Sequence, residues 1–252
     1  MVIASFLFDW ALNFQPLFAV IIISVIVSVL ITLAYKYFTN QVEMKETKKK
    51  MDELRDKTKE KGKSMEEIKN IQSELMKLNF DYMKHTFKPK ILLITMVPIY
   101  FIFAWFNSTL AYEPLLPDQS FTITMDAKIT GSAILDSETL TIISDSNQQT
   151  KPIGKNGNIN QAAWTVKGPE GKHIFEIDFL GRNYTKEILI TNQQKYISPI
   201  SDIKDDKVIQ INSGNNKLNV LNLFGWKLGW LGTYILISLI IGMAVRKLLK
   251  IA

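Results

Sequence analysis

The chain lacks cysteine entirely and has only two histidines among its 252 residues. These absences exclude a disulfide framework, a thiol nucleophile and a zinc-thiolate site. No Gly-rich loop of the Walker type is present to bind a nucleotide. The carboxylates are scattered without a pattern typical of catalysis, and His173 has no evident partner in the sequence. We therefore expect no cofactor, no metal and no enzyme activity.

Charge is also missing from three apolar windows, Leu17–Tyr35, Ile91–Phe106 and Leu228–Val245. As a helix the first window would be about 29 Å long, close to the thickness of a hydrocarbon core. The second window is short for a span and contains Pro98. The residues before the first window lack a basic n-region, so we expect no cleaved signal peptide. The pattern predicts three transmembrane helices rather than the buried helices of a soluble fold.

The distribution of Lys and Arg predicts the orientation of these spans. Residues 36–90 carry 15 basic and 10 acidic side chains, whereas residues 107–225 carry 11 basic and 13 acidic ones. Basic loops stay on the cytoplasmic side. We therefore expect residues 36–90 and the C-terminus in the cytoplasm, and the N-terminus and the large loop outside a plasma membrane. Two sequons in that loop make Asn107 and Asn183 candidate glycosylation sites.

The charged segment after the first window predicts a helical hairpin. It is rich in Lys, Glu, Met and Leu, it breaks at Gly62, and Ser64 with Glu67 has the spacing of a capping box. Apolar side chains follow heptad-like steps, which favours an antiparallel coiled coil. These positions are Met44, Met51, Leu54, Thr58, Met65, Ile68, Ile71 or Gln72, Leu75, Leu78 and Tyr82. The alternative is a flexible apolar surface for varied clients, built from Met44, Met51, Met65, Met76 and Met83.

A basic run crowds the first arm and the tip of this hairpin. It consists of Lys48, Lys49, Lys50, Arg55, Lys57, Lys59, Lys61 and Lys63. Such a run is usually a solvated face, but it also suits anionic lipid headgroups or ribosomal RNA. The net charge of +6 is too small and too uneven for a nucleic-acid coat, so we expect no DNA partner.

Polar side chains inside the apolar windows recur at helical spacing. Ser24, Ser28 and Thr32 share one face of the first helix, with Tyr35 close to it. Tyr234, Ser238 and Gly242 repeat the pattern in the third window, and Thr95 marks the second. This spacing fits close helix packing, and it also fits a hydrated groove.

Residues 118–215 alternate apolar and polar side chains in short stretches between turn residues. Strands are expected at 121–129, 138–145, 162–168, 171–181, 184–191 and 207–213, with a tight hairpin turn at 180–183. Six or seven short strands predict an extracellular all-β immunoglobulin-like domain. The predicted segments are a first span in 1–39, the cytoplasmic hairpin in 40–88, the second span in 89–110, the β domain in 111–220, and the third span with a basic tail in 221–252.

This order of elements resembles the YidC/Oxa insertase superfamily, and within it the small archaeal members. The resemblance covers roughly residues 10–110 and 220–252 and rests on topology and hairpin character. It implies three core helices around a hydrophilic client groove, with a hairpin that meets ribosomes or clients. The groove would be lined by Ser24, Ser28, Thr32, Tyr35, Thr95, Tyr234 and Ser238. The chain departs from the family in lacking an intramembrane arginine and in carrying the outer β domain.

The resemblance implies a protein that assists the integration of membrane proteins through this groove. Its expected partners are nascent membrane proteins, the lipid bilayer, the ribosome and a Sec translocon. Two other classes stay open, namely an envelope-sensing receptor or scaffold that signals through the hairpin, and an ion channel. The missing intramembrane carboxylates argue against cation selectivity.

The predicted sidedness can be measured directly because the chain has no native cysteine. Single cysteines placed at Lys61 and Lys155 should react with an impermeant thiol reagent from opposite sides of sealed vesicles. Labelling of both positions from one side would overturn the orientation.

Overall fold

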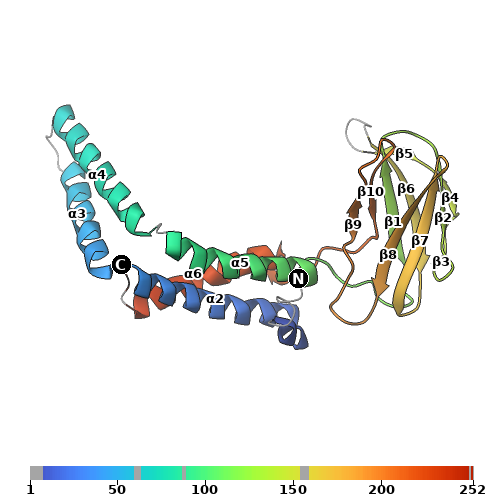
Figure 1. Ribbon diagram of the computed structural model, residues 1–252, viewed down its shortest axis with the longest axis horizontal. Helices are drawn as coiled ribbons and strands as arrows, with labels where there is room; N and C mark the ends of the chain where they lie inside the picture. The colour runs from blue at the N-terminus through green and yellow to red at the C-terminus, as the bar shows by residue number, and fades with distance from the viewer. Residues whose placement is uncertain (1–7, 60–63, 87–88, 154–158, 250, 252) are drawn as a thin grey trace. The chain divides into compact units, whose positions relative to one another are not determined.

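The computed structural model describes residues 8–59, 64–86, 89–153, 159–249 and 251 (Figure 1). Lys61, Lys63 and Lys155 lie outside the described residues. The chain forms two compact units, of which one combines the residues up to Ala104 with Leu231 onward. The other unit runs from Trp105 to Trp230. Each is described by itself below.

Three apolar helices, long enough to cross a membrane, form the framework of the first unit: α2 (Pro16–Phe38), α5 (Pro89–Thr109) and α6 (Trp230–Leu248). A short 3₁₀ turn, η1 (Asp9–Asn13), precedes α2. Proline stands at the start of α2, where its missing N–H costs no hydrogen bond. The α5 helix continues through Pro98 and has 21 residues, about 32 Å. The helix extends beyond its apolar window at both ends, and its candidate span, Leu92–Thr109, is the shortest of the three with 18 residues.

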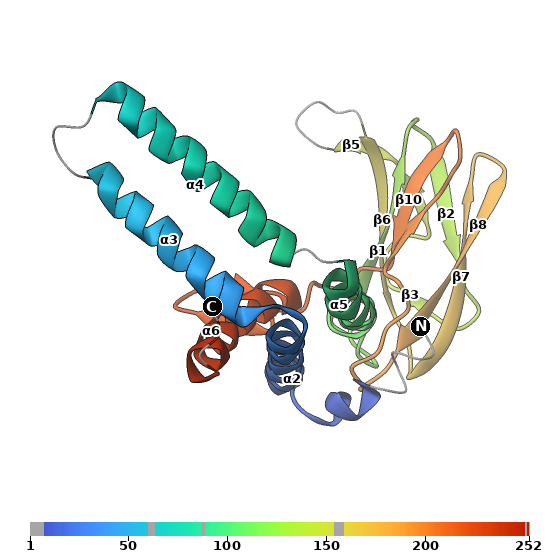
Figure 2. The same ribbon diagram turned by 60° about the vertical axis from the view of Figure 1, so that its left-hand side comes forward.

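The hairpin consists of α3 (Gln41–Lys59) and α4 (Met65–Thr86), which lie side by side (Figure 2). The predicted capping box is present, because the Ser64 N–H donates to Glu67 Oε2 at 2.8 Å and the Glu67 N–H donates to Ser64 Oγ at 3.2 Å. These two bonds satisfy backbone donors that the first turn of a helix leaves free.

The two hairpin helices pack through the apolar seam that the heptad steps predict. Buried side chains of α3 are Met44, Met51 and Leu54. On α4 the half-buried positions are Ile68, Ile71, Leu75, Leu78 and Tyr82. Gln72 is exposed, so Ile71 is the seam residue of that pair of alternatives. The methionines divide between the two interpretations, since Met65, Met76 and Met83 are exposed while the α3 methionines are buried.

The second unit contains two larger antiparallel sheets and one small one. The first sheet has the order β3 (Thr141–Ile142), β6 (Ile159–Lys167), β1 (Phe121–Ala127), β10 (Val208–Asn212), β9 (Ile200–Asp202), with β5 (Lys151–Ile153) also on β6. The second has the order β4 (Asn147–Gln149), β2 (Ser132–Asp136), β7 (Gly171–Phe179), β8 (Arg182–Ile190). The third pairs β11 (Leu221–Leu223) with β12 (Trp226–Leu228).

The inner faces of the two larger sheets share one apolar core, as the period-2 alternation predicts. Alternate residues of β7 point inward, so Phe175, Ile177 and Phe179 are fully buried. Trp164 of β6 is buried opposite and donates its indole N–H to the carbonyl of Ser146 at 2.8 Å. Burying each such side chain contributes roughly 1.5–3 kcal/mol, which is the main stabilisation open to a chain without cysteine. An immunoglobulin-like connectivity stays a prediction.

The strand bounds differ from the sequence expectation at one instructive place. Residues 138–145 were expected as a strand, but only Thr141–Ile142 pairs in a sheet. The Ser137 hydroxyl accepts the Leu140 N–H at 3.3 Å and donates to the carbonyl of Ile174 at 2.9 Å. The Ser137 side chain therefore holds the residues before Thr141 in a turn, and this turn competes with strand pairing. The tight turn at Leu180 is confirmed, since Leu180 and Gly181 have φ of 53° and 74°.

Lys186 of β8 is a lysine on the inward side of its strand, with only 5% of its surface exposed. Its ammonium donates to the carbonyl of Ser198 at 2.9 Å and to Ser201 Oγ at 2.6 Å, both neutral acceptors. Burial lowers the pKa of Lys186 from 10.5 to about 8. The folded protein therefore holds this proton less tightly than the unfolded chain does.

We expect the free energy of unfolding to rise between about pH 8 and pH 10.5, because in that window the unfolded chain binds more protons at Lys186. The gain should be on the order of 3 kcal/mol, since one pKa unit corresponds to about 1.4 kcal/mol. The Lys186→Met variant should lose this rise, whatever its stability at pH 8. The measurement is thermal unfolding of the full chain in detergent, followed by near-ultraviolet circular dichroism.

The matched control is Lys172→Met on β7, which removes an exposed lysine paired with Glu187 at 3.3 Å. This control shares every other titrating group and should keep the wild-type pH slope. If both variants keep that slope, Lys186 does not titrate in this window.

Candidate functional site: a hydroxyl-lined pocket between two spans

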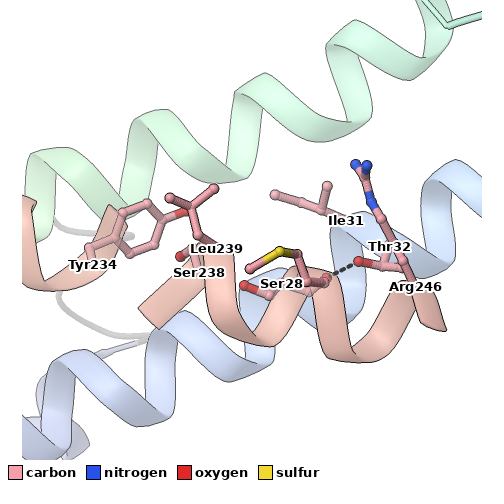
Figure 3. A pocket seen from close by; sticks show the side chains of 9 residues that line it. Ser28, Ile31, Thr32, Tyr234, Ser238, Leu239 and Arg246 are labelled. Carbon is pink, nitrogen blue, oxygen red and sulfur yellow. Dashed lines mark hydrogen bonds between the residues drawn. The ribbon is translucent and has the colours of Figure 1, made fainter. Parts of the chain in front are cut away.

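A pocket of about 260 Å³ lies between α2 and α6 (Figure 3). It is lined by Ser28, Ile31 and Thr32 from α2, and by Tyr234, Ser238, Leu239, Gly242, Met243 and Arg246 from α6. Four hydroxyl-bearing side chains and one guanidinium therefore meet within helices that are otherwise apolar.

On the α2 side, the polar face is buried and partly satisfied within its own helix. Ser24, Ser28 and Thr32 have 0%, 7% and 5% of their surfaces exposed. Ser24 Oγ donates to the carbonyl of Val20, and Thr32 Oγ1 donates to that of Ser28, both at 2.6 Å. Such bonds one turn back allow a hydroxyl to be buried without the cost of an unpaired polar group.

On the α6 side, the pocket contains space and an unsatisfied hydroxyl. Ser238 Oγ is buried without a well-formed hydrogen bond within the described residues, although it lies near enough to the Tyr234 hydroxyl to interact with it. Gly242 faces open space, since a Cβ added there would meet nothing within 4 Å. Tyr234 is 8% exposed and packs edge-on against Phe103 of α5, with ring centroids 5.1 Å apart. A buried polar atom without a well-formed hydrogen bond, beside empty space, is suited to hydrogen bonding with water or a ligand.

Arg246 adds a guanidinium to the pocket lining, which the sequence prediction of the groove did not include. The α6 helix continues to Leu248, so Arg246 lies in its last turn and not in a tail. Its guanidinium carbon is 5.6 Å from the centre of the Tyr35 ring, a distance typical of a cation–π contact. A cation in the last turn also interacts favourably with the helix dipole. The pocket therefore has a positive charge at one end.

The base of the hairpin joins the same region. Tyr35, near the end of α2, donates its hydroxyl to the sulfur of Met44 in α3 at 3.6 Å. Tyr82 of α4 interacts with Tyr35. The pKa of Tyr82 is raised, mainly because the side chain is partly buried and also because of this interaction. Side chains from both hairpin helices thus reach the end of the pocket at which Arg246 lies.

The structure brings four of the seven candidate groove residues into the pocket, namely Ser28, Thr32, Tyr234 and Ser238. Ser24 lies one turn along the same face and is fully buried outside the pocket lining. Tyr35 lies beside Arg246, and Thr95 of α5 donates to the carbonyl of Leu92 at 3.2 Å, away from the lining. The sequence prediction of the groove missed Arg246. The spacing could have identified it, because Arg246 lies four residues after Gly242, in the same series as Tyr234 and Ser238.

The basic run lies on the exposed side of α3. Its described members Lys48, Lys49, Lys50, Arg55, Lys57 and Lys59 are all exposed. Arg55 pairs with Asp52 at 3.1 Å and Lys59 with Asp56 at 2.9 Å, which offsets part of the positive charge. Such exposed pairs stabilise the helix little and leave the side chains free to exchange partners.

The two candidate glycosylation residues occupy regular elements and are both exposed. Asn107 lies in the last turn of α5, and its carbonyl accepts the Tyr196 hydroxyl at 2.5 Å. Asn183 lies near the start of β8.

Three apolar helices with a helical hairpin between the first two describe an integral membrane protein. A family model for integral membrane proteins that are EMC3/TMCO1-like matches residues 2–144, more than half of the chain, and the chain belongs to this family. The family falls in the Oxa1/YidC-related insertase group. The match includes α2, the hairpin and α5, whereas α6 and most of the β strands lie beyond it. Searches of curated proteins and of solved structures returned no significant match.

Proposed function

We propose that this protein assists the integration of other membrane proteins, as an insertase of the YidC/Oxa type. The observation that carries the proposal is the pocket between α2 and α6, where hydroxyls and a guanidinium gather inside apolar helices. Membership in the EMC3/TMCO1-like family supports an insertase-related role. The proposed arrangement has the hairpin and the C-terminus in the cytoplasm of a cell bounded by a plasma membrane, with the β domain outside.

The pocket would act by lowering the cost of moving a polar segment through the bilayer. A peptide group without a hydrogen bond costs roughly 2–7 kcal/mol in hydrocarbon. The Ser238 hydroxyl has only the neighbouring Tyr234 hydroxyl to interact with within the described residues, and the pocket volume of about 260 Å³ has room for several waters. A client segment could therefore exchange hydrogen bonds with the wall and with water on its way. The apolar helix of the client would provide the driving free energy by entering lipid.

The wall of the pocket is open on the side that faces lipid. Leu239 and Met243 both line the pocket and have 60% and 66% of their surfaces exposed. A client helix could leave sideways at this place without unfolding the bundle.

The hairpin offers two surfaces to proposed partners. Exposed Met76, Phe80 and Met83 follow one face of α4 and suit the apolar segments of nascent membrane proteins. The exposed basic side of α3 suits ribosomal RNA, or anionic lipid headgroups. A Sec translocon is a further proposed partner, for clients with outer segments too long for so small a pocket.

Filling the pocket should block insertion without unfolding the protein. In the Ser28→Leu, Ser238→Leu double variant, each client polar group would meet hydrocarbon in place of a hydroxyl and water. We expect insertion of a single-span client with a short polar outer tail to slow at least about tenfold, which needs only about 1.4 kcal/mol. The measurements are protease protection of the client in reconstituted vesicles and thermal unfolding of the same preparation.

Two further variants separate the pocket from simple helix packing. Ser24→Leu overfills a fully buried position outside the pocket and should lower stability by about 1–3 kcal/mol. Thr95→Leu, on α5 and outside the lining, should leave insertion unchanged. A double variant that folds and inserts normally would remove the pocket from the mechanism, and one that melts as early as Ser24→Leu would indicate a packed face.

Reversing charge on α3 should abolish salt-sensitive association with translating ribosomes. The variant changes Lys48, Lys49, Lys50, Arg55 and Lys57 to Glu, so that phosphate groups are repelled instead of bound. The measurement is co-sedimentation at low and raised salt. As a control, Lys69, Lys77 and Lys84 of α4 are changed to Glu. Co-sedimentation that survives the α3 reversal at low salt would show that this face does not bind the ribosome.

A further inference from the structure

The β11–β12 hairpin stands apart from the two larger sheets and ends in a bare aromatic tip. Its register pairs Leu221 with Leu228 and Leu223 with Trp226. Phe224 and Gly225 form the turn with φ of 51° and 91°, and the Gly225 N–H donates to Asn222 Oδ1 at 3.0 Å. A two-stranded hairpin alone is marginally stable in water, so this one is expected to gain stability from another contact.

The tip exposes more apolar surface than any neighbouring segment of the strands. Phe224 is 106% exposed, which means that nothing in the described structure covers it, and Trp226 is 69% exposed. Phe224 also has a positive φ, a conformation that costs an L-residue roughly 1–2 kcal/mol. In water this residue would combine backbone strain with an unburied ring. Moving the phenylalanine side chain out of water would stabilise this conformation by about 1.5–3 kcal/mol, enough to offset the backbone strain.

The position of the hairpin in the chain restricts where that contact can be. Trp226 precedes Trp230, the first residue of α6, by four positions, and Phe224 precedes it by six. Even fully extended, these stretches reach only about 14 and 22 Å. The 19 residues of α6 are about 28 Å long, close to the thickness of the hydrocarbon core. Trp230 is therefore expected at the membrane interface, and the hairpin within reach of it.

A second connection of the same unit leads to the end of α5. Gln194 Nε2 donates to the carbonyls of Thr109 and Tyr112, both at 2.9 Å, which satisfies acceptors at the end of this helix. Phe106 in the last turns of α5 packs against Trp230, with ring centroids 5.4 Å apart. The ends of two spans thus meet within this unit. Aromatic side chains gathered at the ends of spans are typical of a membrane interface.

We propose that the β11–β12 hairpin is a lipid-binding wedge, in which Phe224 and Trp226 enter the interfacial layer of the leaflet on the β-domain side. Exposed Lys227 stands next to Trp226 on the same strand, where it suits the phosphates of lipid headgroups. The occupant of this surface is therefore the bilayer itself. The proposal depends on membership in a membrane protein family and not on the insertase function.

The β7–β8 hairpin provides a matched control in the same unit. Its Leu180–Gly181 turn also has two positive φ angles, and the Gly181 N–H donates to Asp178 Oδ1 at 3.1 Å, as in the other turn. Here the tip is followed by Arg182, which binds Asp205 at 2.9 Å. Leu180 is 44% exposed and approaches Gly131. The two hairpins thus share turn chemistry but differ in their apolar tip.

The experiment uses the full chain, which has no native cysteine, in phosphatidylcholine vesicles. Phe224→Cys and Leu180→Cys variants are each labelled with a bimane and compared in vesicles with and without brominated acyl chains. At position 224 we expect a blue-shifted emission, quenched by brominated lipid and protected from aqueous iodide. At position 180 we expect quenching by iodide only. A label at 224 that iodide quenches and brominated lipid does not would overturn the proposal.

A blue-shifted label at 224 that neither quencher reaches would indicate a protein contact, such as a second copy of the chain, and would also overturn it. The second measurement keeps Phe224 in place. Brominated lipid should quench a smaller part of the tryptophan fluorescence in the Trp226→Tyr variant than in the unmodified chain. If brominated lipid quenches the same fraction of the tryptophan fluorescence in the variant and in the unmodified chain, Trp226 does not contact lipid.

Discussion

The need to satisfy polar groups inside apolar helices is the constraint on which the membrane unit depends. Hydrocarbon provides no hydrogen-bond partner, so each hydroxyl in a span is bonded within the protein or meets water. Ser24 and Thr32 bond to carbonyls of α2, and both are buried at little cost. Ser238 has no such bond within the described residues, and it lines the pocket with Arg246. Thr32 lines the same pocket, so a hydroxyl that is bonded within its own helix can still border it.

The two units are stabilised by different means. The β unit has a continuous core of side chains such as Trp164 and Phe175, and its cross-sheet contacts include the pair of Arg182 with Asp205. The buried positions that the structure gives α6 are Thr233 and Tyr234, so most of its apolar surface faces outward. Lipid would cover this surface, and the bundle can therefore keep a pocket that a soluble core would close. Under the wedge proposal, the same solvent would cover the exposed Phe224, six residues before α6.

The periodicity and capping signals predicted most of the elements. Apolar windows marked the three spans, Ser64 and Glu67 marked the start of α4, and alternation marked β7 and β8. The failures have local causes. A hydroxyl bond from Ser137 replaced strand pairing after β2, and the β11–β12 hairpin was missed because its residues adjoin an apolar window. The four hydroxyl-bearing residues of the pocket followed from steps of four, but Arg246 was assigned to a tail because charge usually ends a span.

By itself, the sequence determined the class of the protein, since an apolar run long enough to cross a bilayer has few stable forms other than a helix. It also determined the faces of helices and strands, because side-chain direction follows the period of each element. Only the tertiary structure decided which hydroxyls are packed and which border a pocket. Ser24 and Ser28 have the same spacing and chemistry, yet Ser24 is fully buried outside the pocket whereas Ser28 lines it. Space between helices depends on the side chains of both partners, and no single helix contains that information.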